Sequence, residues 1–285
     1  MQENQLMVDK VCLITGATSG IGLVTAQEMA RQGADLVLVS RSEDKCRRVA
    51  ESLRDETGNQ QIEYLAGDLS SLKEIRQVAD RFQERYSRLD VLVNNAGRLF
   101  WQRGESADGL EMTFALNHLG YFTLTALLLD TLKESAPARI VNVSSGAHRG
   151  QRLDFADLQM EENYSPNKAY GRSKLANLYF TYALDRRLEG TGVTVNALHP
   201  GFVNTNFARE GNSPLRFLMP LMQLFARSPE EGAETVIYLA SSPEVKGVSG
   251  KYYKDKEPVK SSPISYQSEP AEKLWERSEE IAGLD

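Results

Sequence analysis

Residues 11–22 read VCLITGATSGIG, an apolar run followed by three glycines at Gly16, Gly20 and Gly22. Their spacing, four and then two, differs from the G-x-G-x-x-G fingerprint of many dinucleotide-binding turns. Such glycines still permit a tight turn, let the backbone approach a pyrophosphate and leave its charge facing a helix N-terminus. We therefore predict a strand at 11–15, a helix at 20–32 and a dinucleotide site between them, which also includes Thr18, Ser19 and Ile21. Many strand-to-helix turns are glycine-rich for steric reasons alone, and this alternative stays open.

The alternation of apolar strand-like runs and amphipathic helical stretches continues along the chain. Further strands are predicted at 36–40, 62–66, 91–94, 140–144, 194–199 and 248–253. Helices are predicted at 43–57, after a capping box of Ser71 and Glu74, through Asn117, at 169–189, from Ser228 and at 271–281. This pattern predicts an α/β fold with a single Rossmann-like, doubly wound parallel sheet and helices on both faces. We expect one domain over residues 1–285, with an apolar segment at about 202–227 and a polar tail at about 254–285.

Composition excludes several classes of protein. With 41% hydrophobic and 25% charged residues, the chain has the composition of a folded globular protein. Its net charge of -6 argues against nucleic-acid binding, which needs a basic surface. Three scattered histidines argue against a histidine-rich metal site, and two cysteines cannot build a disulfide framework. Without a long apolar run or a signal-peptide core, we expect a cytoplasmic protein that has no integral membrane anchor.

The end of the second predicted strand indicates which cofactor the site prefers. An acidic residue there binds the ribose 2′-hydroxyl of NAD, whereas a nearby arginine accommodates the 2′-phosphate of NADP. Here Ser40 is followed by Arg41, and neither position is acidic. A guanidinium can bind a phosphate through two parallel hydrogen bonds. The sequence therefore favours NADP(H), the alternative being that Arg41 is a solvated loop charge.

A second signal comes from the pattern Tyr-x-x-x-Lys, which occurs three times, as Tyr164/Lys168, Tyr170/Lys174 and Tyr252/Lys256. Pro166 disrupts regular helix within the first pair, and the third pair lies in a polar segment after the last predicted strand. Only the second pair lies in a strong helical pattern, where positions i and i+4 share a face. It also follows the predicted strand that leads to Ser145.

These residue types suit proton transfer to a carbonyl oxygen. A free phenol has a pKa near ~10, and a neighbouring ammonium lowers that value. Tyr170 would then act as a general acid in reduction or a general base in oxidation. Ser145 would donate a hydrogen bond to the carbonyl oxygen as it gains charge, and Lys174 would also bind the nicotinamide ribose. The structural alternatives are helix packing for Tyr170, a surface charge for Lys174 and strand-end capping for Ser145.

Over nearly its full length the chain resembles the short-chain dehydrogenase/reductase family. The resemblance rests on the glycine turn, NNAG at 94–97, Asn117, Ser145, the Tyr170/Lys174 pair and PG at 200–201. It implies that Asn117 kinks its helix and holds a water that relays protons to Lys174. It also implies a set of cofactor contacts, namely Asp68 and Leu69 beside the adenine, Asn95, Ala96 and Gly97 as a wall after the fourth strand, and Pro200, Gly201, Val203 and Thr205 around the carboxamide and pyrophosphate.

Within that family the chain is most similar to the retinol dehydrogenase-like branch. The marks are RIVNVSS at 139–145, SKLAN at 173–177, HPG at 199–201 and a long segment between Ser145 and Tyr170. One departure is that Gly171 and Arg172 stand where this branch commonly has Cys-His.

The apolar segment at 202–227, with Phe100 and Trp101 nearby, would form a lid over the nicotinamide. A lid of this kind favours a lipophilic, retinal-like aldehyde or ketone as substrate, but the segment could instead pack on the core or on another subunit. Two other functions stay open, a C=C reductase of the protochlorophyllide type and a non-catalytic NADP-responsive sensor or scaffold. The resemblance also implies a homo-oligomer paired through the helices that carry Asn117 and Tyr170, unless the 146–169 segment covers that surface.

Overall fold

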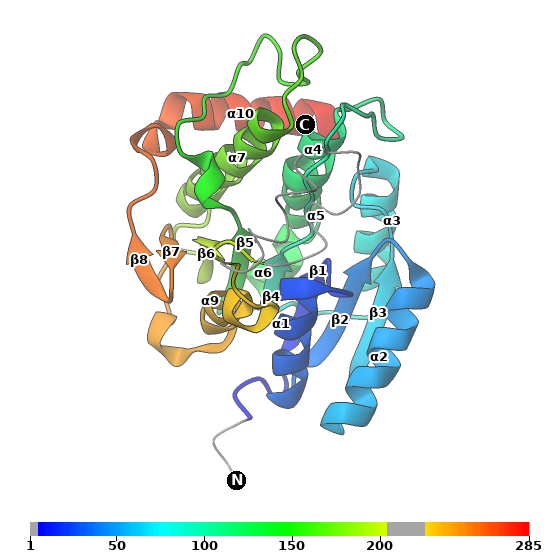
Figure 1. Ribbon diagram of the computed structural model, residues 1–285. Helices are drawn as coiled ribbons and strands as arrows, with labels where there is room; N and C mark the ends of the chain where they lie inside the picture. The colour runs from blue at the N-terminus through cyan, green and yellow to red at the C-terminus, as the bar shows by residue number, and fades with distance from the viewer. Residues whose placement is uncertain (1–4, 204–225, 285) are drawn as a thin grey trace.

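The computed structural model describes residues 5–203 and 226–284, and its centre is one eight-stranded sheet (Figure 1). The strand order is β3-β2-β1-β4-β5-β6-β7-β8, in which every neighbouring pair is parallel except β7 with β8. The predicted doubly wound fold is confirmed, and the expectation of a wholly parallel sheet is corrected at one edge. The strands are β1 Val11–Thr15, β2 Asp35–Ser40, β3 Ile62–Ala66, β4 Val91–Asn94, β5 Ala138–Val143, β6 Val193–His199, β7 Tyr252–Lys254 and β8 Glu257–Val259.

The edge hairpin was not visible as a turn in the sequence. Asp255 and Lys256 connect β7 to β8, and both have positive φ, at 54° and 63°. Two consecutive residues with positive φ form the turn whose twist suits a tight hairpin, and glycine or asparagine usually supplies them. Neither residue type is present here, so the sequence did not predict the turn. In place of the single strand predicted at 248–253, the structure has a short strand at Tyr252–Lys254 that is followed by a hairpin.

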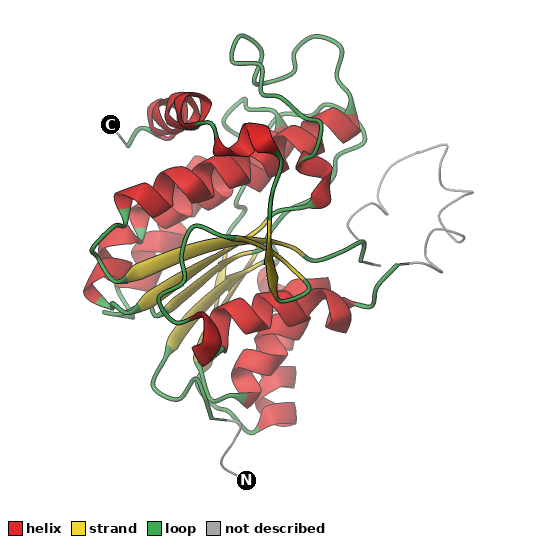
Figure 2. Ribbon diagram, turned by 90° about the vertical axis from the view of Figure 1, so that its left-hand side faces the viewer, coloured by secondary structure: helices red, strands yellow, loops and turns green. Residues whose placement is uncertain are grey.

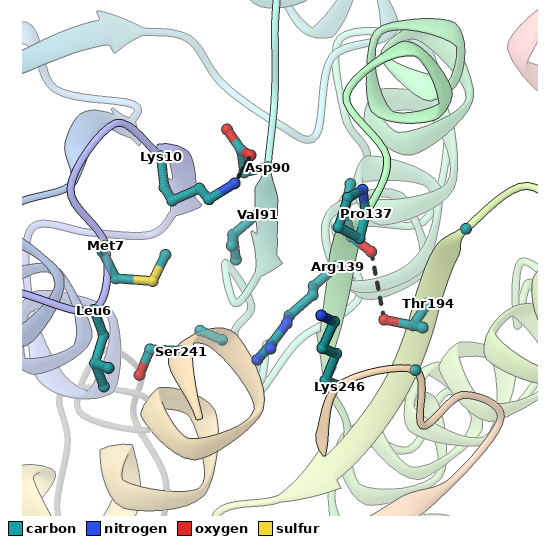
Figure 3. A pocket seen from close by; sticks show the side chains of 14 residues that line it. Leu6, Met7, Lys10, Asp90, Val91, Pro137, Arg139, Thr194, Ser241 and Lys246 are labelled. Atoms are coloured by element: carbon teal, nitrogen blue, oxygen red, sulfur yellow. Dashed lines mark hydrogen bonds and ion pairs between the residues drawn. The ribbon is translucent and has the colours of Figure 1, made fainter. Parts of the chain in front are cut away.

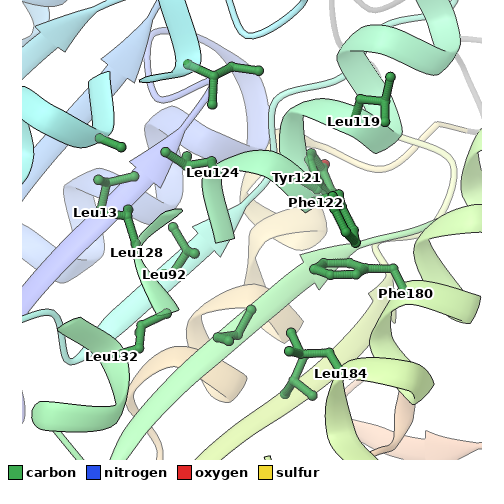
Figure 4. Close-up of a cluster of buried hydrophobic side chains, with 14 of the residues drawn as sticks. Leu13, Leu92, Leu119, Tyr121, Phe122, Leu124, Leu128, Leu132, Phe180 and Leu184 are labelled. Atoms are coloured by element: carbon green, nitrogen blue, oxygen red, sulfur yellow. The ribbon is translucent and has the colours of Figure 1, made fainter. Parts of the chain in front are cut away.

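Helices cover both faces of the sheet, as Figure 2 shows. One face carries α1, α2 and α9, and the other carries α3, α5, α7 and α10, each face with its own buried apolar cluster. In the cluster on the face of α3, α5, α7 and α10, Leu13 and Leu92 of the sheet pack with Leu124 and Phe122 of α5 (Figure 4). The helices are α1 Gly20–Arg31, α2 Glu43–Thr57, α3 Leu72–Gln83, α4 Met112–Phe114, η1 Ala115–Leu119, α5 Gly120–Leu127, α6 Leu129–Glu134, η2 Gly146–His148, α7 Pro166–Arg187, α9 Pro229–Ser241, η5 Pro243–Val245, η6 Pro263–Tyr266 and α10 Ser268–Ala282.

A capping box forms at the helix start predicted at Ser228, whereas the one predicted at Ser71 does not. At α9 the Ser228 hydroxyl accepts from the Glu231 amide at 3.2 Å, and the Glu231 carboxylate accepts from the Ser228 amide at 2.8 Å. At α3 the Ser71 side chain makes no capping bond, so the predicted box with Glu74 is wrong. The Glu74 carboxylate instead accepts from the Asp68 amide at 2.8 Å, because the turn after β3 brings that donor closer.

The long helix expected through Asn117 is interrupted. A π-helical turn, η1, lies between α4 and α5, and Asn117 sits at its centre. Single π-turns inside α-helices are frequent at functional sites. The later helix α7 begins at Pro166 rather than at 169, since proline suits the first helical turn. Tyr164 therefore lies outside the helix that holds Lys168.

The C-terminal tail is ordered and ends in α10, which packs on α5 and α7. The Trp275 ring lies 5.0 Å from that of Phe122 and 5.9 Å from that of Phe180, and the Arg187 guanidinium lies 4.0 Å above it. The α5/α7 face is therefore covered by the chain's own C-terminal helix, and Leu153, Phe155 and Leu158 of the 146–169 segment pack against the same apolar cluster. The homo-oligomer stays a prediction. Among residues 5–203 and 226–284, no helix has the length and apolarity needed to cross a bilayer.

Candidate active site

The predicted site residues gather where β1, β4, β5 and β6 end. Because these strands are parallel, their carboxyl ends meet at one edge of the sheet, where ligands of open α/β sheets bind. Thr15, at the end of β1, links β1 to the end of β4 and to the segment that follows it. Its hydroxyl donates to the Val93 carbonyl at 3.1 Å and accepts from the amides of Asn95 at 2.8 Å and Ala96 at 3.0 Å. Sequence reasoning missed Thr15, since nothing in its local pattern indicates contacts with residues 80 positions away.

Steric demands account for two of the three glycines in the turn. A Cβ on Gly22 would lie 2.3 Å from the Gly16 carbonyl oxygen, and a Cβ on Gly16 would lie 2.9 Å from the Ala96 Cα. The Asn95 side chain closes the turn by donating to the Thr15 carbonyl at 2.8 Å. The steric explanation is therefore correct for Gly16 and Gly22. The absence of a side chain at Gly16 lets the turn approach the segment after β4 closely.

The same turn fits a pyrophosphate. At the start of α1 the Ser19 side chain makes no capping bond, and the first turn of the helix contains no acidic residue. Uncapped amides at a helix N-terminus, together with the helix dipole, attract a phosphate group. Gly20, Ile21 and Gly22 begin this helix, so their amides are the groups that would hold a dinucleotide.

The end of β2 lies beside the turn. The Ser40 hydroxyl is 3.0 Å from the Thr18 hydroxyl, and Arg41 follows on the surface with an exposed side chain. Of the acids next along the chain, Asp44 already pairs with Arg47 at 3.1 Å. This arrangement fits a 2′-phosphate beside Arg41.

The two residues implied to border the adenine differ in their surroundings. The Asp68 carboxylate accepts from the Ser70 amide at 3.0 Å and the Ser70 hydroxyl at 2.7 Å, so this turn is held locally. Leu69 is buried in the apolar core, and its carbonyl oxygen would lie 2.7 Å from a Cβ on Gly120. The Leu69 side chain therefore faces the core, and its contact with the adenine stays a prediction.

Ser145, Tyr170 and Lys174 come together as predicted. Ser145 follows β5, and its hydroxyl hydrogen-bonds Tyr170 on α7. The Lys174 ammonium donates to the Val143 carbonyl at 2.9 Å and lies 5.6 Å from the centre of the Tyr170 ring and 5.4 Å from that of Tyr121. Lys174 is buried, with 3% of its surface exposed, so the surface-charge alternative is excluded for it.

The expectation that Lys174 lowers the pKa of Tyr170 is wrong for this arrangement. Burial raises the pKa of Tyr170 to about 12, and its hydrogen bond with Ser145 offsets only part of that rise. Burial also lowers the pKa of Lys174 to about 7, because the ammonium loses its hydration. A lysine with a lowered pKa carries less positive charge near neutral pH, which weakens its effect on the phenol.

Asn117 fastens the segment after β4 to α7. Its side-chain oxygen accepts from the Arg98 amide at 2.8 Å, and its side-chain nitrogen donates to the Arg98 carbonyl at 3.0 Å and the Ser173 hydroxyl at 3.1 Å. A Cβ on Gly97 would lie 3.1 Å from the Asn117 oxygen and 3.5 Å from the Lys174 nitrogen. Gly97 thus lies close to both Asn117 and Lys174. The proton relay through Asn117 stays a prediction.

The segment after β6 lies against Arg227 and the start of α9. Gly201 has φ of +88°, and the Phe202 carbonyl accepts from the Arg227 amide at 2.7 Å. Val203 bridges to Arg227, and its methyl groups and the Ile21 side chain both press on Gly232 at the start of α9. Thr205 and residues 204–225 of the apolar segment lie outside the described residues, and so does the predicted lid. Phe100 and Trp101 are half-buried in the segment after β4.

Two histidines that sequence reasoning did not place in the site flank Ser145. The His148 Nδ1 atom lies 2.6 Å from the Ser145 carbonyl oxygen, and the His199 Nδ1 atom accepts from the Gly146 amide at 3.1 Å. His199 stands in the HPG motif at the end of β6, and this motif could have indicated that the histidine lies near the site.

A pocket elsewhere on the molecule is separate from this site. It is lined by Val91, Arg139 and Thr194, which stand near the amino ends of β4, β5 and β6, and by the end of α9 (Figure 3). Among its lining residues, Lys10 pairs with Asp90 at 2.9 Å, and Arg139 donates to the Leu239 carbonyl at 3.1 Å. Because these lining residues stand near the amino ends of the strands, the pocket lies at the edge of the sheet opposite to Ser145.

Comparison with known proteins identifies the family. The family model described as short chain dehydrogenase matches residues 10–215. The chain belongs to the short-chain dehydrogenase/reductase family. Human retinol dehydrogenase 14 is 44% identical to this short-chain dehydrogenase, over 98% of this chain and 88% of its own length. Human polyprenol dehydrogenase is 41% identical, over 97% of this chain and 86% of its own.

Two solved structures agree with the fold. A Mycobacterium Paratuberculosis protein superposes with a TM-score of 0.79 at 34% identity, covering 97% of this chain and 94% of its own. The Pseudomonas aeruginosa RhlG/NADP active-site complex superposes with a TM-score of 0.70 at 27% identity, covering 88% and 96%. The protein is an oxidoreductase related to the retinol dehydrogenases, of a family that uses NAD(P)H and acts on small molecules.

Proposed function

We propose that this protein is an NADP(H)-dependent oxidoreductase that interconverts a lipophilic, retinal-like aldehyde or ketone and its alcohol. The observation that carries the proposal is the contact between Ser145 and Tyr170 beside the buried Lys174, at the same sheet edge as the glycine turn. A packing role for these residues would not need a buried lysine that lacks a carboxylate partner among its described contacts.

The chain's own residues would handle the proton. Because burial raises the pKa of Tyr170 to about 12, its phenol keeps the proton at neutral pH and would deliver it to a carbonyl oxygen. Ser145 would donate a second hydrogen bond to that oxygen, where charge develops during reduction. Lys174 would hold the ribose and orient Tyr170. When bound, the nicotinamide supplies the hydride in reduction or accepts it in oxidation.

NADP(H) is the cofactor that we propose, because Arg41 follows β2 where NAD-binding sites place an acid. The exposed guanidinium would bind the 2′-phosphate, and the Ser40 and Thr18 hydroxyls lie beside it. The RhlG complex, whose cofactor is named as NADP, supports this choice by analogy.

A lipophilic substrate is proposed from two observations. The relatives named above are dehydrogenases of retinol and polyprenol, which are long apolar alcohols. In this chain Phe100 and Trp101 lie on the segment that follows β4, close to the site. The proposed substrate is therefore an apolar molecule with one carbonyl or hydroxyl group. A cytoplasmic location stays a prediction from composition alone.

The test follows NADPH absorbance with aldehydes and ketones of graded chain length, and repeats the series with NADH. We expect turnover that prefers NADPH and increases with apolar chain length, and that disappears in Tyr170→Phe. NADPH binding without reduction of any carbonyl would move the function toward C=C reduction or a sensor role. Equal turnover with NADH would contradict the cofactor choice alone.

A further inference from the structure

The backbone around Ser145 is held at three consecutive residues. The Ser145 hydroxyl accepts from the Ala147 amide at 3.2 Å. The Gly146 amide donates to His199 at 3.1 Å, and the Ser145 carbonyl oxygen lies 2.6 Å from Nδ1 of His148. Two histidines, on the η2 turn and at the end of β6, therefore fix the loop that carries the Ser145 hydroxyl.

The partners of His148 define its protonation. A carbonyl oxygen only accepts hydrogen bonds, so Nδ1 of His148 carries the hydrogen that it donates to Ser145. The other ring nitrogen, Nε2, accepts from the Ser262 amide at 3.0 Å. His148 is fully buried, with 0% of its surface exposed, and the Tyr252 ring packs edge-on against it at 5.2 Å. The imidazole is thus a neutral bridge between Ser145 and Ser262, which are far apart in sequence.

The far end of this bridge is itself anchored. Ser262 belongs to a segment, residues 260–266, that connects β8 to α10. The Ser261 hydroxyl lies 2.7 Å from the Tyr182 hydroxyl of α7, and the Ser261 amide donates to the Tyr266 hydroxyl at 3.0 Å. Arg149 donates to the Lys260 carbonyl at 2.9 Å. The C-terminal segment is therefore attached both to the helix that carries Tyr170 and to the turn after Ser145.

We propose that His148 is a positioning residue, and that with residues 260–266 it fixes the Ser145 loop relative to Tyr170 for hydride-transfer chemistry. The inference rests on the proposed role of Ser145. It adds that the C-terminal segment sets the geometry of the active site through one imidazole.

Position 262 offers a matched pair of variants. Ser262 has φ of -67° and ψ of 145°, which proline adopts without strain, so Ser262→Pro removes the amide donor and little else. Among the described residues the Ser262 hydroxyl has no hydrogen-bond partner, so Ser262→Ala keeps the amide and removes only an idle group. The two variants therefore separate the bond to His148 from the side chain.

We expect Ser262→Pro to lower kcat by about 10- to 100-fold, because small misplacements of catalytic groups have effects of that size. The Kd for NADPH should stay close to that of the wild type, whereas the Tm should decrease because Nε2 of the buried His148 loses its donor. Ser262→Ala should match the wild type in kcat, Kd and Tm. His148→Asn, which is too short to reach Ser262, should reproduce the loss of kcat and serves if Ser262→Pro does not fold. An unchanged kcat would overturn the proposal, and so would a loss of NADPH affinity as large as the loss of kcat.

A second readout does not depend on turnover. In protein labelled with ¹⁵N-histidine, the His148 resonances should report a hydrogen on Nδ1 and a bare, hydrogen-bonded Nε2. Ser262→Pro should shift the Nε2 resonance, and Ser262→Ala should leave it in place. A hydrogen on Nε2 of His148 would overturn the proposed bridge. If the wild type reduces no carbonyl while these shifts appear as expected, the proposed function fails and the bridge to Ser262 stands.

Discussion

Replacing Lys174 with methionine should abolish turnover and yet stabilise the folded protein. The Lys174 side chain is 3% exposed, and its nitrogen meets the Val143 carbonyl and two aromatic rings rather than a carboxylate. Burial lowers the pKa of this lysine from 10.5 to about 7. Methionine has a similar length and no charge to desolvate, so it removes this cost while filling most of the same space.

The magnitude follows from that pKa. One pKa unit corresponds to about 1.4 kcal/mol, so holding this lysine in the fold at pH 7 costs about 4 kcal/mol relative to water. Loss of the hydrogen bond to Val143 offsets about 1 to 2 kcal/mol of the gain. We therefore expect the Lys174→Met variant to be more stable by about 2 kcal/mol at pH 7.

The sign of the pH dependence gives a sharper test. The unfolded chain binds a proton on this lysine below pH 10.5, whereas the folded chain binds it only below about 7. The penalty is therefore complete below pH 7 and fades as the pH rises toward 10.5, so wild-type stability should increase over that range. Relative to the variant, the wild type should recover about 2 kcal/mol between pH 7 and pH 9.

Urea unfolding of both proteins at pH 7, 8 and 9 measures this difference. The control is Lys168→Met, which removes an exposed lysine from the same helix and should leave stability nearly unchanged at every pH. A difference between wild type and Lys174→Met that is the same at pH 7 and pH 9 would refute the reasoning from a buried ammonium.

Three further outcomes are expected. Tyr170→Phe should keep NADPH affinity and lose about 100- to 10,000-fold in kcat, measured by single-turnover absorbance; substantial residual activity would remove Tyr170 from its role. Arg41→Asp should lower the ratio of kcat/KM for NADPH to that for NADH by at least about 10-fold, and an unchanged ratio would discredit the 2′-phosphate contact. Gly22→Ala should lower both Tm and NADPH affinity, because its Cβ would lie 2.3 Å from the Gly16 carbonyl oxygen, whereas Gly104→Ala, with nothing within 4 Å, should change neither.

Local spacing was enough to predict several elements of the site. The apolar run and glycines of residues 11–22 correctly place β1, its turn and α1. The spacing of four between Tyr170 and Lys174 correctly puts both on one helix, α7. At one point where the local pattern failed, a distant acceptor is involved. At α3 the amide of Leu72 donates to Asp108, which lies 36 residues away, and Ser71 makes no capping bond.

The sequence by itself determined the doubly wound sheet, the glycine turn after β1 and the placement of Tyr170 and Lys174 on one helix, since each depends on periodicity or on spacing within one element. Only the tertiary structure decided how those groups ionise and what holds them. Burial, rather than the neighbouring ammonium, controls the pKa of Tyr170, and His148 joins Ser145 to a residue 114 positions beyond the histidine itself. Desolvation and long-range hydrogen bonds depend on which segments meet in space, and local sequence patterns do not specify those long-range contacts.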